Sequence, residues 1–364
     1  MVKEPHCSRP RYCSRMDLAI IGATGSCGRQ VAAQVAERGI LPEIATMHLI
    51  GHAGGEHESE LWGLRADLRD AFADTAPSIE VGTEVAATNA DLVVMMAGAT
   101  VTRTDSDRAA LAEKNLRIFT EVAEAIGRMG NSPIVVVQSN PVELAVDLLG
   151  RHVPRHRILG AAAWSDSLRF RRELAADLGV RRPMVQAQMW GQHGDHLVPI
   201  YSRIHARGVD EQFAADVIGK MREGRVLADL HGEISEARMR ALSMVHDGSV
   251  AEAYAFIQRQ PADVRAAVKP FFTHFTAGRT TELATAHAVV DIVEFIVRAQ
   301  RRVIPAQVQL EGEEWGIHAP LAVPVLLGPL GWSQVVPEPL AEDELAALLT
   351  AAQAIRTANA AMTS

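Results

Sequence analysis

The chain has 364 residues, 48% hydrophobic and 22% charged, and its formal net charge at pH 7 is −8. This length exceeds what one hydrophobic core usually supports, so we expect two globular domains. The negative charge argues against general binding to nucleic acid or anionic membranes, and no apolar run reaches the ~20 residues of a membrane span.

Residues 1–16 precede the first strand-like run, and we predict that they form a disordered N-terminal extension. They contain basic residues but no apolar core, which is unlike a secretory signal. The three cysteines, Cys7, Cys13 and Cys27, cannot build a disulfide framework. This favours free thiols over a regulatory Cys7–Cys13 pair, and a reducing, cytoplasmic location.

From residue 17 onward, short apolar runs alternate with longer amphipathic ones. We predict buried strands at 17–21, 44–50, 91–98, 133–138 and 157–161. The intervening helices are predicted at 28–39, 105–129 and 142–149. Strands that alternate with helices in this way form parallel sheets with crossover helices, so the sequence predicts a doubly wound α/β fold.

The pattern changes after about residue 183. Two antiparallel strand pairs are predicted, one from 184–190 and 198–205 and one within 319–336. Helical segments are predicted at 210–268, 280–300 and 341–359. We therefore predict a second, α+β domain over residues 151–364.

The motif GATGSCG, residues 22–28, lies between the first predicted strand and the first helix. Its three glycines allow a tight turn and the close approach of a pyrophosphate to the helix N-terminus, where free N–H groups favour negative charge. We interpret residues 17–150 as a dinucleotide-binding domain; an ordinary strand–helix turn is the alternative. The candidate cofactor contacts in this motif are Gly22, Gly25, Ser26, Cys27 and Gly28.

The second predicted strand ends in LIGHAGG, with Gly51 and His52 where an acid would hold the adenosine ribose. Without that carboxylate, discrimination against a 2′-phosphate weakens. Both residues are candidate cofactor contacts, and NAD and NADP both remain open.

Polar residues gather in four further segments, GATVTRTDSDRAALAEKN (98–115), QSNP (138–141), SDSLRF (165–170) and GQHGD (191–195). Asp166 and Arg169 are three residues apart and share one face of a helix, which also fits a plain ion pair. His193 and His196 could suggest a zinc site, but residues three apart on an extended segment face opposite sides. We predict no metal site, and we interpret His196 as a pocket-rim or packing residue.

In this order, the motifs resemble the lactate/malate dehydrogenase family. The resemblance is carried by GATGSCG, the AGAT…DRAAL loop, SNPVELA, the D-S-L-R quartet, GQHGD and EGEEWGIHAPLAVPVLLGPLGWSQVVPEPL. It implies a Rossmann domain followed by a substrate domain, and an NAD(P)-dependent oxidoreductase that interconverts malate, or a related 2-hydroxy acid, and its 2-oxo acid. It also implies a homodimer or homotetramer.

The resemblance assigns roles to three residues. His193 corresponds to the proton carrier, and its side chain has an unperturbed pKa suited to proton exchange near neutrality. Asp166 corresponds to the carboxylate that orients the imidazole. Arg169 corresponds to the guanidinium that binds the substrate carboxylate through two parallel hydrogen bonds.

Further roles are implied around these three. Arg108 corresponds to the arginine that polarises the substrate carbonyl when the loop closes, and Asn140 to an amide that bonds the reacting oxygen. Thr281 corresponds to a residue that lines the substrate pocket. Gly98, Asn115 and Asn140 are further candidate cofactor contacts.

Departures from the family pattern leave the substrate open. Malate dehydrogenases carry an additional loop arginine for the second carboxylate, and Arg103 is the nearest candidate, although Val101 or Thr102 occupies that register. If Arg103 reaches the substrate, a dicarboxylate such as malate is expected. If Val101 lines the pocket, a monocarboxylic acid with an apolar side chain is expected. A larger 2-hydroxy acid is a separate alternative.

Two other features are unusual for the family. Trp164 replaces a smaller residue, and could narrow the pocket or pack under it. A helical excess around residues 222–260 could cover the active site, contact a neighbouring subunit, or do neither. A dinucleotide-binding sensor or scaffold without catalytic activity is the alternative from another functional class.

Overall fold

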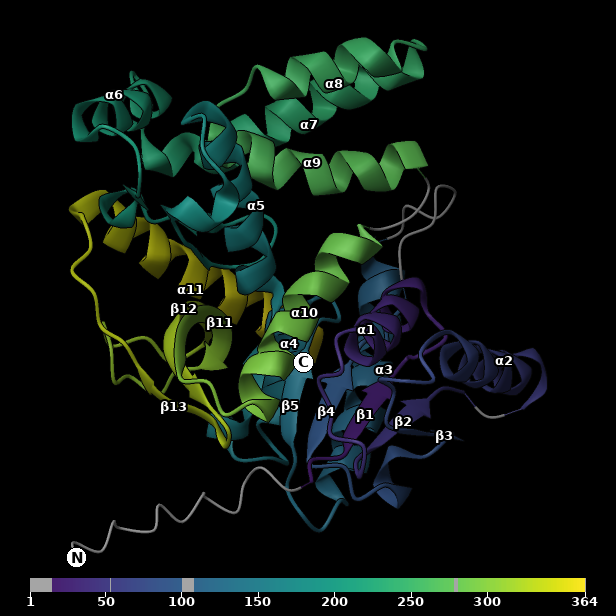
Figure 1. Ribbon diagram of the computed structural model, residues 1–364. Helices are drawn as coiled ribbons and strands as arrows, with labels where there is room; N and C mark the ends of the chain where they lie inside the picture. The colour runs from purple at the N-terminus through teal and green to yellow at the C-terminus, as the bar shows by residue number, and fades with distance from the viewer. Residues whose placement is uncertain (1–14, 53, 100–107, 278–280, 364) are drawn as a thin grey trace, which may run out of the picture.

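The computed structural model describes residues 15–52, 54–99, 108–277 and 281–363, and not the side chains of 108–112 and 277. The predicted N-terminal extension, Cys7, Cys13 and Arg103 therefore lie outside the described residues. Within them, the main feature is one mixed sheet with the strand order β3-β2-β1-β4-β5-β6-β11-β12-β8-β9, with β13 paired to β12. Figure 1 shows this sheet with helices against it.

The first half of the sheet is parallel, as predicted. Its strands are β1 (Leu18–Ile21), β2 (Thr46–Ile50), β3 (Ser78–Gly82), β4 (Leu92–Met95), β5 (Ile134–Val137) and β6 (Ile158–Gly160). The connecting helices are α1 (Ser26–Glu37), α2 (Gly55–Ala71), α3 (Arg108–Gly127), α4 (Val142–Leu149) and α5 (Ala162–Asp177). Strands β1, β4 and β5 are buried along their whole length, as crossover helices on both faces require. The doubly wound α/β fold is confirmed.

The second half of the sheet is antiparallel. Its strands are β8 (Met189–Gly191), β9 (Leu197–Pro199), β11 (Arg302–Gln309), β12 (Pro320–Gly328) and β13 (Gly331–Val335). A small separate pair is formed by β7 (Val185–Gln186) and β10 (His205–Ala206). Both predicted antiparallel pairs are thus present, the first one interrupted into β7–β10 and β8–β9.

Helices complete this second part of the chain. They are α6 (Glu211–Arg222), α7 (Leu230–His246), α8 (Val250–Gln258), α9 (Ala262–Ala277), α10 (Glu282–Val297) and α11 (Glu342–Thr363). One-turn 3-10 helices lie at Val85–Ala87, Arg155–Arg157, Arg182–Met184, Tyr201–Arg203 and Leu227–Asp229. The helical segments predicted over 210–268 are α6, α7, α8 and the first part of α9; Gly224 (φ 69°) and Gly248 (φ 82°) lie in the breaks between them, and Pro261 precedes α9.

The two halves share their core. One cluster of buried apolar side chains runs from β1 and α1 through α5 to α9, α10 and β12. The parallel strands extend to β6, beyond the boundary predicted at residue 150, and β6 pairs directly with β11. Figure 1 shows α7, α8 and α9 stacked on the far side of α5 from the sheet.

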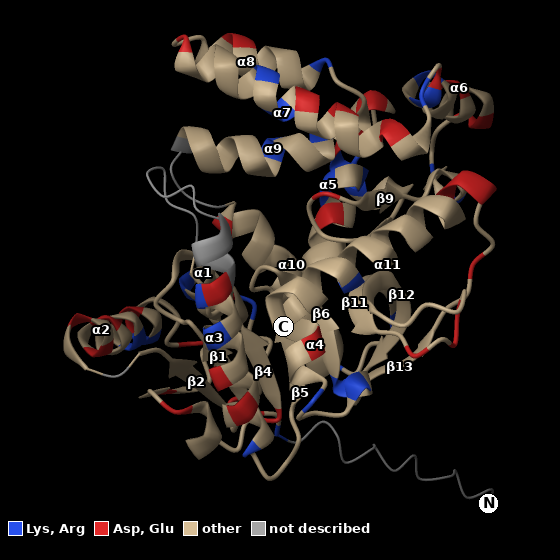
Figure 2. Ribbon diagram, turned by 180° about the vertical axis from the view of Figure 1, so that it is seen from behind, with Lys and Arg blue, Asp and Glu red and all other residues tan. Residues whose placement is uncertain are grey.

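Charged residues are distributed over both halves. Figure 2 shows basic and acidic positions mixed along α7 and α2. Among the described helices, none is both long and apolar enough to cross a membrane.

Candidate active site

The glycine loop between β1 and α1 brings the backbone unusually close to itself. Gly22 has φ 82°, and a Cβ on Gly28 would lie 2.2 Å from the Gly22 carbonyl oxygen. Helix α1 begins at Ser26, and the preceding Gly25 gives it no side-chain cap. The first N–H groups of α1 therefore face the loop without a side-chain acceptor, which suits a bound phosphate.

A cavity of about 630 Å³ opens beside this loop. Of the predicted cofactor contacts, it is lined by Gly22, Gly25, Gly51, His52 and Gly98. Ser26 and Gly28 do not line it: Ser26 is exposed on α1, and Gly28 is buried.

The part of this cavity next to the end of β2 carries two imidazoles. His52 and His57 lie with ring centroids 5.7 Å apart, and the carboxylates of Glu84 and Glu121 also line the cavity. A Cβ on Gly51 would lie 3.0 Å from Cδ1 of Leu61, so this position is tight. The end of β2 supplies no acid.

A second cavity, of about 600 Å³, contains the candidate catalytic residues. It shares Met96, Gly98 and Ala99 with the first cavity, so the two are adjacent at the carboxyl end of β4. The two adjacent cavities could hold an elongated ligand whose phosphate groups lie at the α1 N-terminus.

His193, Asp166 and Arg169 form a continuous chain of hydrogen bonds in the second cavity. His193 Nδ1 lies 2.7 Å from Asp166 Oδ2, and Asp166 Oδ1 accepts a 3.1 Å bond from Arg169 Nη1. Asp166 is buried on α5, whereas the His193 side chain is 24% exposed. One nitrogen of His193 is thus held by Asp166, and the other remains for a ligand.

The turn that carries His193 is fixed by glycines and by a buried glutamate. Gly191 and Gly194 have φ values of 82° and 107°, and Gln192 N donates to the His196 carbonyl oxygen at 3.0 Å. The backbone N–H of His193 donates to Oε1 of Glu143 at 2.8 Å. Sequence analysis missed Glu143, although an acid inside the apolar run VELAVDLL was a usable signal.

The surrounding charges shift the pKa values of this group. Burial lowers the pKa of His193, but the negative charges of Asp166 and Glu143 outweigh it, and the net shift is upward. Burial raises the pKa of Asp166, but His193 and Arg169 outweigh that effect, and the net shift is downward. Asp166 is therefore ionised and stabilises a protonated His193.

Arg169 is held on its other side by two threonines. Its Nη2 donates to Thr281 Oγ1 at 3.1 Å and to Thr285 Oγ1 at 3.4 Å. The plain ion-pair interpretation of Asp166 and Arg169 is thus incomplete, because the guanidinium also reaches across the cavity to α10. Thr281 lies where sequence analysis expected it, and Thr285 is an addition.

Asn140, Asn115 and Cys27 line the same cavity. Asn140 is exposed at the end of β5. The Asn115 side chain accepts from Ala99 N at 2.6 Å and donates to the Asn140 carbonyl oxygen at 2.9 Å, so its observed bonds hold two backbone segments. Burial is the main cause that raises the pKa of Cys27 to about 11, so it is a thiol at neutral pH.

Helix α9 contributes a separate surface, which we name the α9 wall. It consists of Ala266, Ala267, Pro270, Phe271, His274 and Phe275. The rings of Phe271 and Phe275 lie 4.6 Å apart. Arg238, from the helical excess in α7, lines the cavity beside this wall.

Helix α7 also holds the turn that follows His193. Arg238 Nη1 lies 3.3 Å from Asp195 Oδ1, and His231 Nδ1 lies 2.9 Å from the Asp195 carbonyl oxygen. The rings of His196 and His231 stack at 5.0 Å. Among the described residues, no group of three or more His, Cys, Asp or Glu side chains could hold a metal ion.

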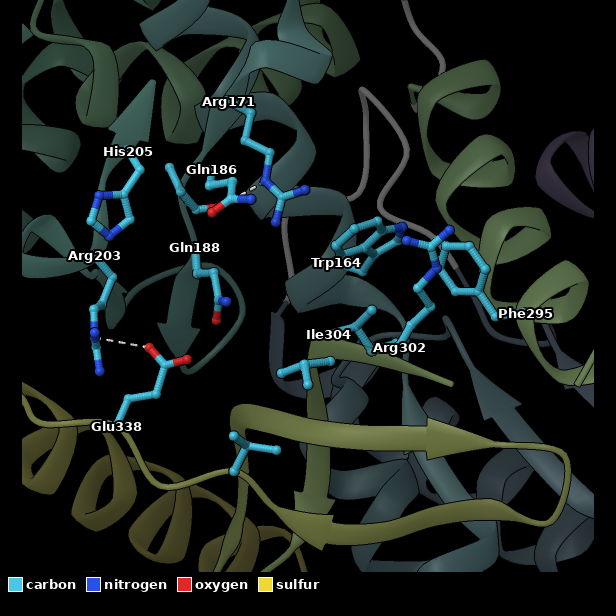
Figure 3. Close-up of a pocket in the computed structure, with 13 residues that line it drawn as sticks. Trp164, Arg171, Gln186, Gln188, Arg203, His205, Phe295, Arg302, Ile304 and Glu338 are labelled. Atoms are coloured by element: carbon cyan, nitrogen blue, oxygen red, sulfur yellow. Dashed lines mark hydrogen bonds and ion pairs between the residues drawn. The ribbon is translucent and has the colours of Figure 1, made fainter. Parts of the chain in front are cut away.

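Trp164 lies outside the catalytic cavity. It lines a different pocket of about 500 Å³, where it contacts Phe295, with ring centroids 6.1 Å apart, and Arg171. Figure 3 shows this pocket, with Trp164 near Phe295 and Arg302. Trp164 therefore does not narrow the catalytic cavity. Arg103 and the side chain of Arg108 lie outside the described residues.

Two family models match the chain. One describes the lactate/malate dehydrogenase NAD-binding domain and matches residues 16–160; the other describes the alpha/beta C-terminal domain of the same family and matches residues 275–363. Asp166, Arg169 and His193 lie between these two ranges.

Curated relatives match nearly the whole chain. A malate dehydrogenase from Methanothermobacter thermautotrophicus is 31% identical over 349 residues, covering 94% of this chain and 95% of the relative. An L-lactate dehydrogenase from Petromyzon marinus is 25% identical, covering 96% and 93%.

Solved structures share the fold. A malate dehydrogenase from Cryptosporidium parvum has a TM-score of 0.73 at 19% identity, covering 96% of this chain and 99% of that one. A lactate dehydrogenase from the same organism, complexed with lactic acid and nicotinamide adenine dinucleotide, also has a TM-score of 0.73, at 21% identity with the same coverage.

Proposed function

The chain belongs to the lactate/malate dehydrogenase family, and on this basis we propose that it is a nicotinamide-dinucleotide-dependent oxidoreductase of malate or a related 2-hydroxy acid. The observation that supports this most directly is the chain of hydrogen bonds from His193 through Asp166 to Arg169. It lies in a cavity adjacent to the one beside the glycine loop. We also propose that the cofactor domain ends near residue 150 and that the helices around residues 222–260 are an insertion in the substrate domain.

The proposed mechanism assigns proton transfer to His193. When bound, the dinucleotide supplies the hydride donor or acceptor. In the oxidation direction, His193 takes the hydroxyl proton of the substrate at Nε2, because Asp166 engages Nδ1. In the reduction direction, His193 returns that proton to the carbonyl oxygen, while Asp166 remains ionised and holds the imidazolium.

Substrate positioning falls to the remaining polar residues. Arg169 donates two parallel hydrogen bonds to the carboxylate of the acid, with Thr281 and Thr285 fixing its orientation. Asn140 bonds the reacting oxygen from the end of β5. Arg108 polarises the carbonyl group, a role that rests on the resemblance of its loop to that of the family.

The cofactor preference follows from the ribose end of the first cavity. Gly51 and His52 supply no carboxylate there, so we expect weak discrimination between NADH and NADPH. The homodimer or homotetramer and the cytoplasmic location stay predictions of the sequence.

The test replaces His193 with Asn and measures reduction of a panel of 2-oxo acids with NADH and NADPH in parallel. We expect kcat to fall by at least about 100-fold, since positioned proton transfer contributes about 10²–10⁴-fold. Dinucleotide binding, followed by fluorescence, should be retained. The matched control is His205→Asn, because His205 is an exposed histidine outside the catalytic cavity.

Near wild-type turnover in His193→Asn would contradict the proposal. A wild-type chain that binds NADH or NADPH but reduces no acid of the panel would instead support the alternative of a catalytically silent dinucleotide-binding protein.

A further inference from the structure

Resting on the proposed function, we propose that this enzyme prefers 2-oxo acids with an apolar side chain, aromatic or branched aliphatic, and that Phe271 and Phe275 on the α9 wall select them. The sequence leaves dicarboxylates and apolar acids open. The side chains that α9 places in the cavity distinguish the two.

The α9 wall is one regular face of a helix. Its cavity-lining residues form two rows at four-residue spacing, Ala266–Pro270–His274 and Ala267–Phe271–Phe275. Residues four apart lie one above the other on a helix, so both rows face the same space. The wall is thus a continuous face of α9 that contributes several residues to the cavity.

The two phenylalanines are incompletely covered by protein. Phe271 and Phe275 are both half-buried, while the neighbouring Phe272 is fully buried in the core. The alanines beside them leave room next to the rings. Apolar surface open to a cavity gains free energy when an apolar ligand covers it.

The alanine, proline and phenylalanine side chains of the wall offer no hydrogen bond to an anion, and His274 is the one polar member of the wall. A second carboxylate, like that of oxaloacetate, placed against the apolar members would lose water without gaining a partner. The apolar part of the α9 wall therefore penalises a dicarboxylate and tolerates a hydrocarbon side chain.

Arg238 lies against this wall, and its charge is already engaged. Its Cζ lies 4.9 Å from the ring centroid of Phe271, and its Nη1 lies 3.3 Å from Asp195 Oδ1. Binding a substrate carboxylate there would require competition with Asp195. Arg238 instead stacks on the ring of Phe271 and links it to the turn that follows His193.

The experiment compares kcat/KM of the full chain for phenylpyruvate, 4-methyl-2-oxopentanoate, pyruvate and oxaloacetate. We expect the two large apolar acids to exceed oxaloacetate by at least about 10-fold, the discrimination that a few apolar contacts provide. In Phe271→Ala and Phe275→Ala, kcat/KM for phenylpyruvate should fall by about 10-fold, mainly through KM, with little change for pyruvate.

Phe213→Ala is the matched control, because Phe213 is 48% exposed on α6 and outside the cavity. If an alanine variant does not fold, Phe271→Leu and Phe275→Leu replace it in the experiment. These leucine variants should show a smaller preference for phenylpyruvate over 4-methyl-2-oxopentanoate than the wild type. Unchanged preference in folded Phe271 and Phe275 variants would overturn the assignment of the wall.

Oxaloacetate as the best substrate, with its turnover lost in Arg238→Gln, would overturn the inference and leave the proposed function standing. Turnover of no 2-oxo acid, or turnover that persists in His193→Asn, would instead reject the proposed function itself. The two failures are therefore distinguishable.

Discussion

Two parts of the catalytic cavity differ in how they are stabilised. The group formed by His193, Asp166 and Arg169 is held by hydrogen bonds that link side chains of α5 to the β8–β9 turn and to a threonine hydroxyl at the start of α10. The α9 wall is held by apolar packing, and its rings contact one another. Because the charged group needs fixed geometry and the wall needs only shape, we expect substitutions in the first to alter the chemistry and those in the second to alter substrate choice.

The strongest test of this difference is Asp166→Asn. The change removes the charge that raises the pKa of His193, so protonated His193 becomes scarcer at neutral pH. We expect kcat for reduction to fall by about 10³–10⁴-fold, as for other amide replacements of a carboxylate that orients a catalytic imidazole. Reduction requires the protonated imidazole. As the pH rises, the remaining activity of the variant should therefore be lost at a lower pH than that of the wild type.

A pH–rate profile measures this effect, with Asp67→Asn on α2 as the exposed control. An unshifted profile in Asp166→Asn would show that Asp166 does not set the pKa of His193. The Phe271→Ala and Phe275→Ala variants should keep the wild-type profile.

Arg169→Lys should give the next largest effect. Lysine keeps the charge but cannot donate two parallel hydrogen bonds to a carboxylate. We expect KM for the 2-oxo acid to rise by about 100-fold, since a lost hydrogen bond between charged groups costs about 1.5–3 kcal/mol. Steady-state kinetics measures KM, and fluorescence titration should show little change in NADH affinity.

Arg172→Lys is the control, because Arg172 lies on the same helix with a side chain that is 59% exposed. Equal losses of substrate and NADH affinity in Arg169→Lys would contradict a role in holding the substrate carboxylate.

Glu143→Gln should give the smallest effect. Glutamine keeps an acceptor for the His193 backbone N–H but removes a charge that raises the pKa of His193. The pH profile of reduction should shift downward, by less than in Asp166→Asn. We expect a few-fold loss of rate near neutral pH.

Glu143→Gln also tests stability. Burial is the main cause that raises the pKa of Glu143, so the folded wild type loses stability as the pH rises from about 4.5 through that raised pKa. The glutamine variant should lack this loss. Its melting temperature relative to the wild type should therefore be higher at pH 8 than at pH 4; a constant difference would argue against a buried, ionising Glu143.

Much of the fold could be predicted from sequence, because buried parallel strands and crossover helices have distinct periods. The elements missed have physical explanations. Helix α2 is strongly charged and buries only Leu61 and Leu68. Strand β11 contains Pro305, which cannot donate to a neighbouring strand and usually argues against a strand assignment.

The candidate site likewise contains residues that could be predicted from the sequence and residues that could not. Sequence motifs identified His193, Asp166 and Arg169, and the structure brings them into contact. The motifs did not identify Thr285 or the α9 wall, because their positions depend on how distant helices pack. Glu143 stands inside the motif SNPVELA, but its hydrogen bond to the His193 backbone N–H joins residues 50 positions apart, and short-range spacing does not reveal such a partner.

The pairing of β6 with β11 has a consequence for folding. Gly160 lies opposite Gln307, and the parallel and antiparallel halves form one hydrogen-bonded sheet with one shared core. A fragment ending after β6 would expose an unpaired strand edge and the apolar surface that normally covers it. We therefore expect the two halves to unfold as one cooperative unit, and neither half to fold stably without the other.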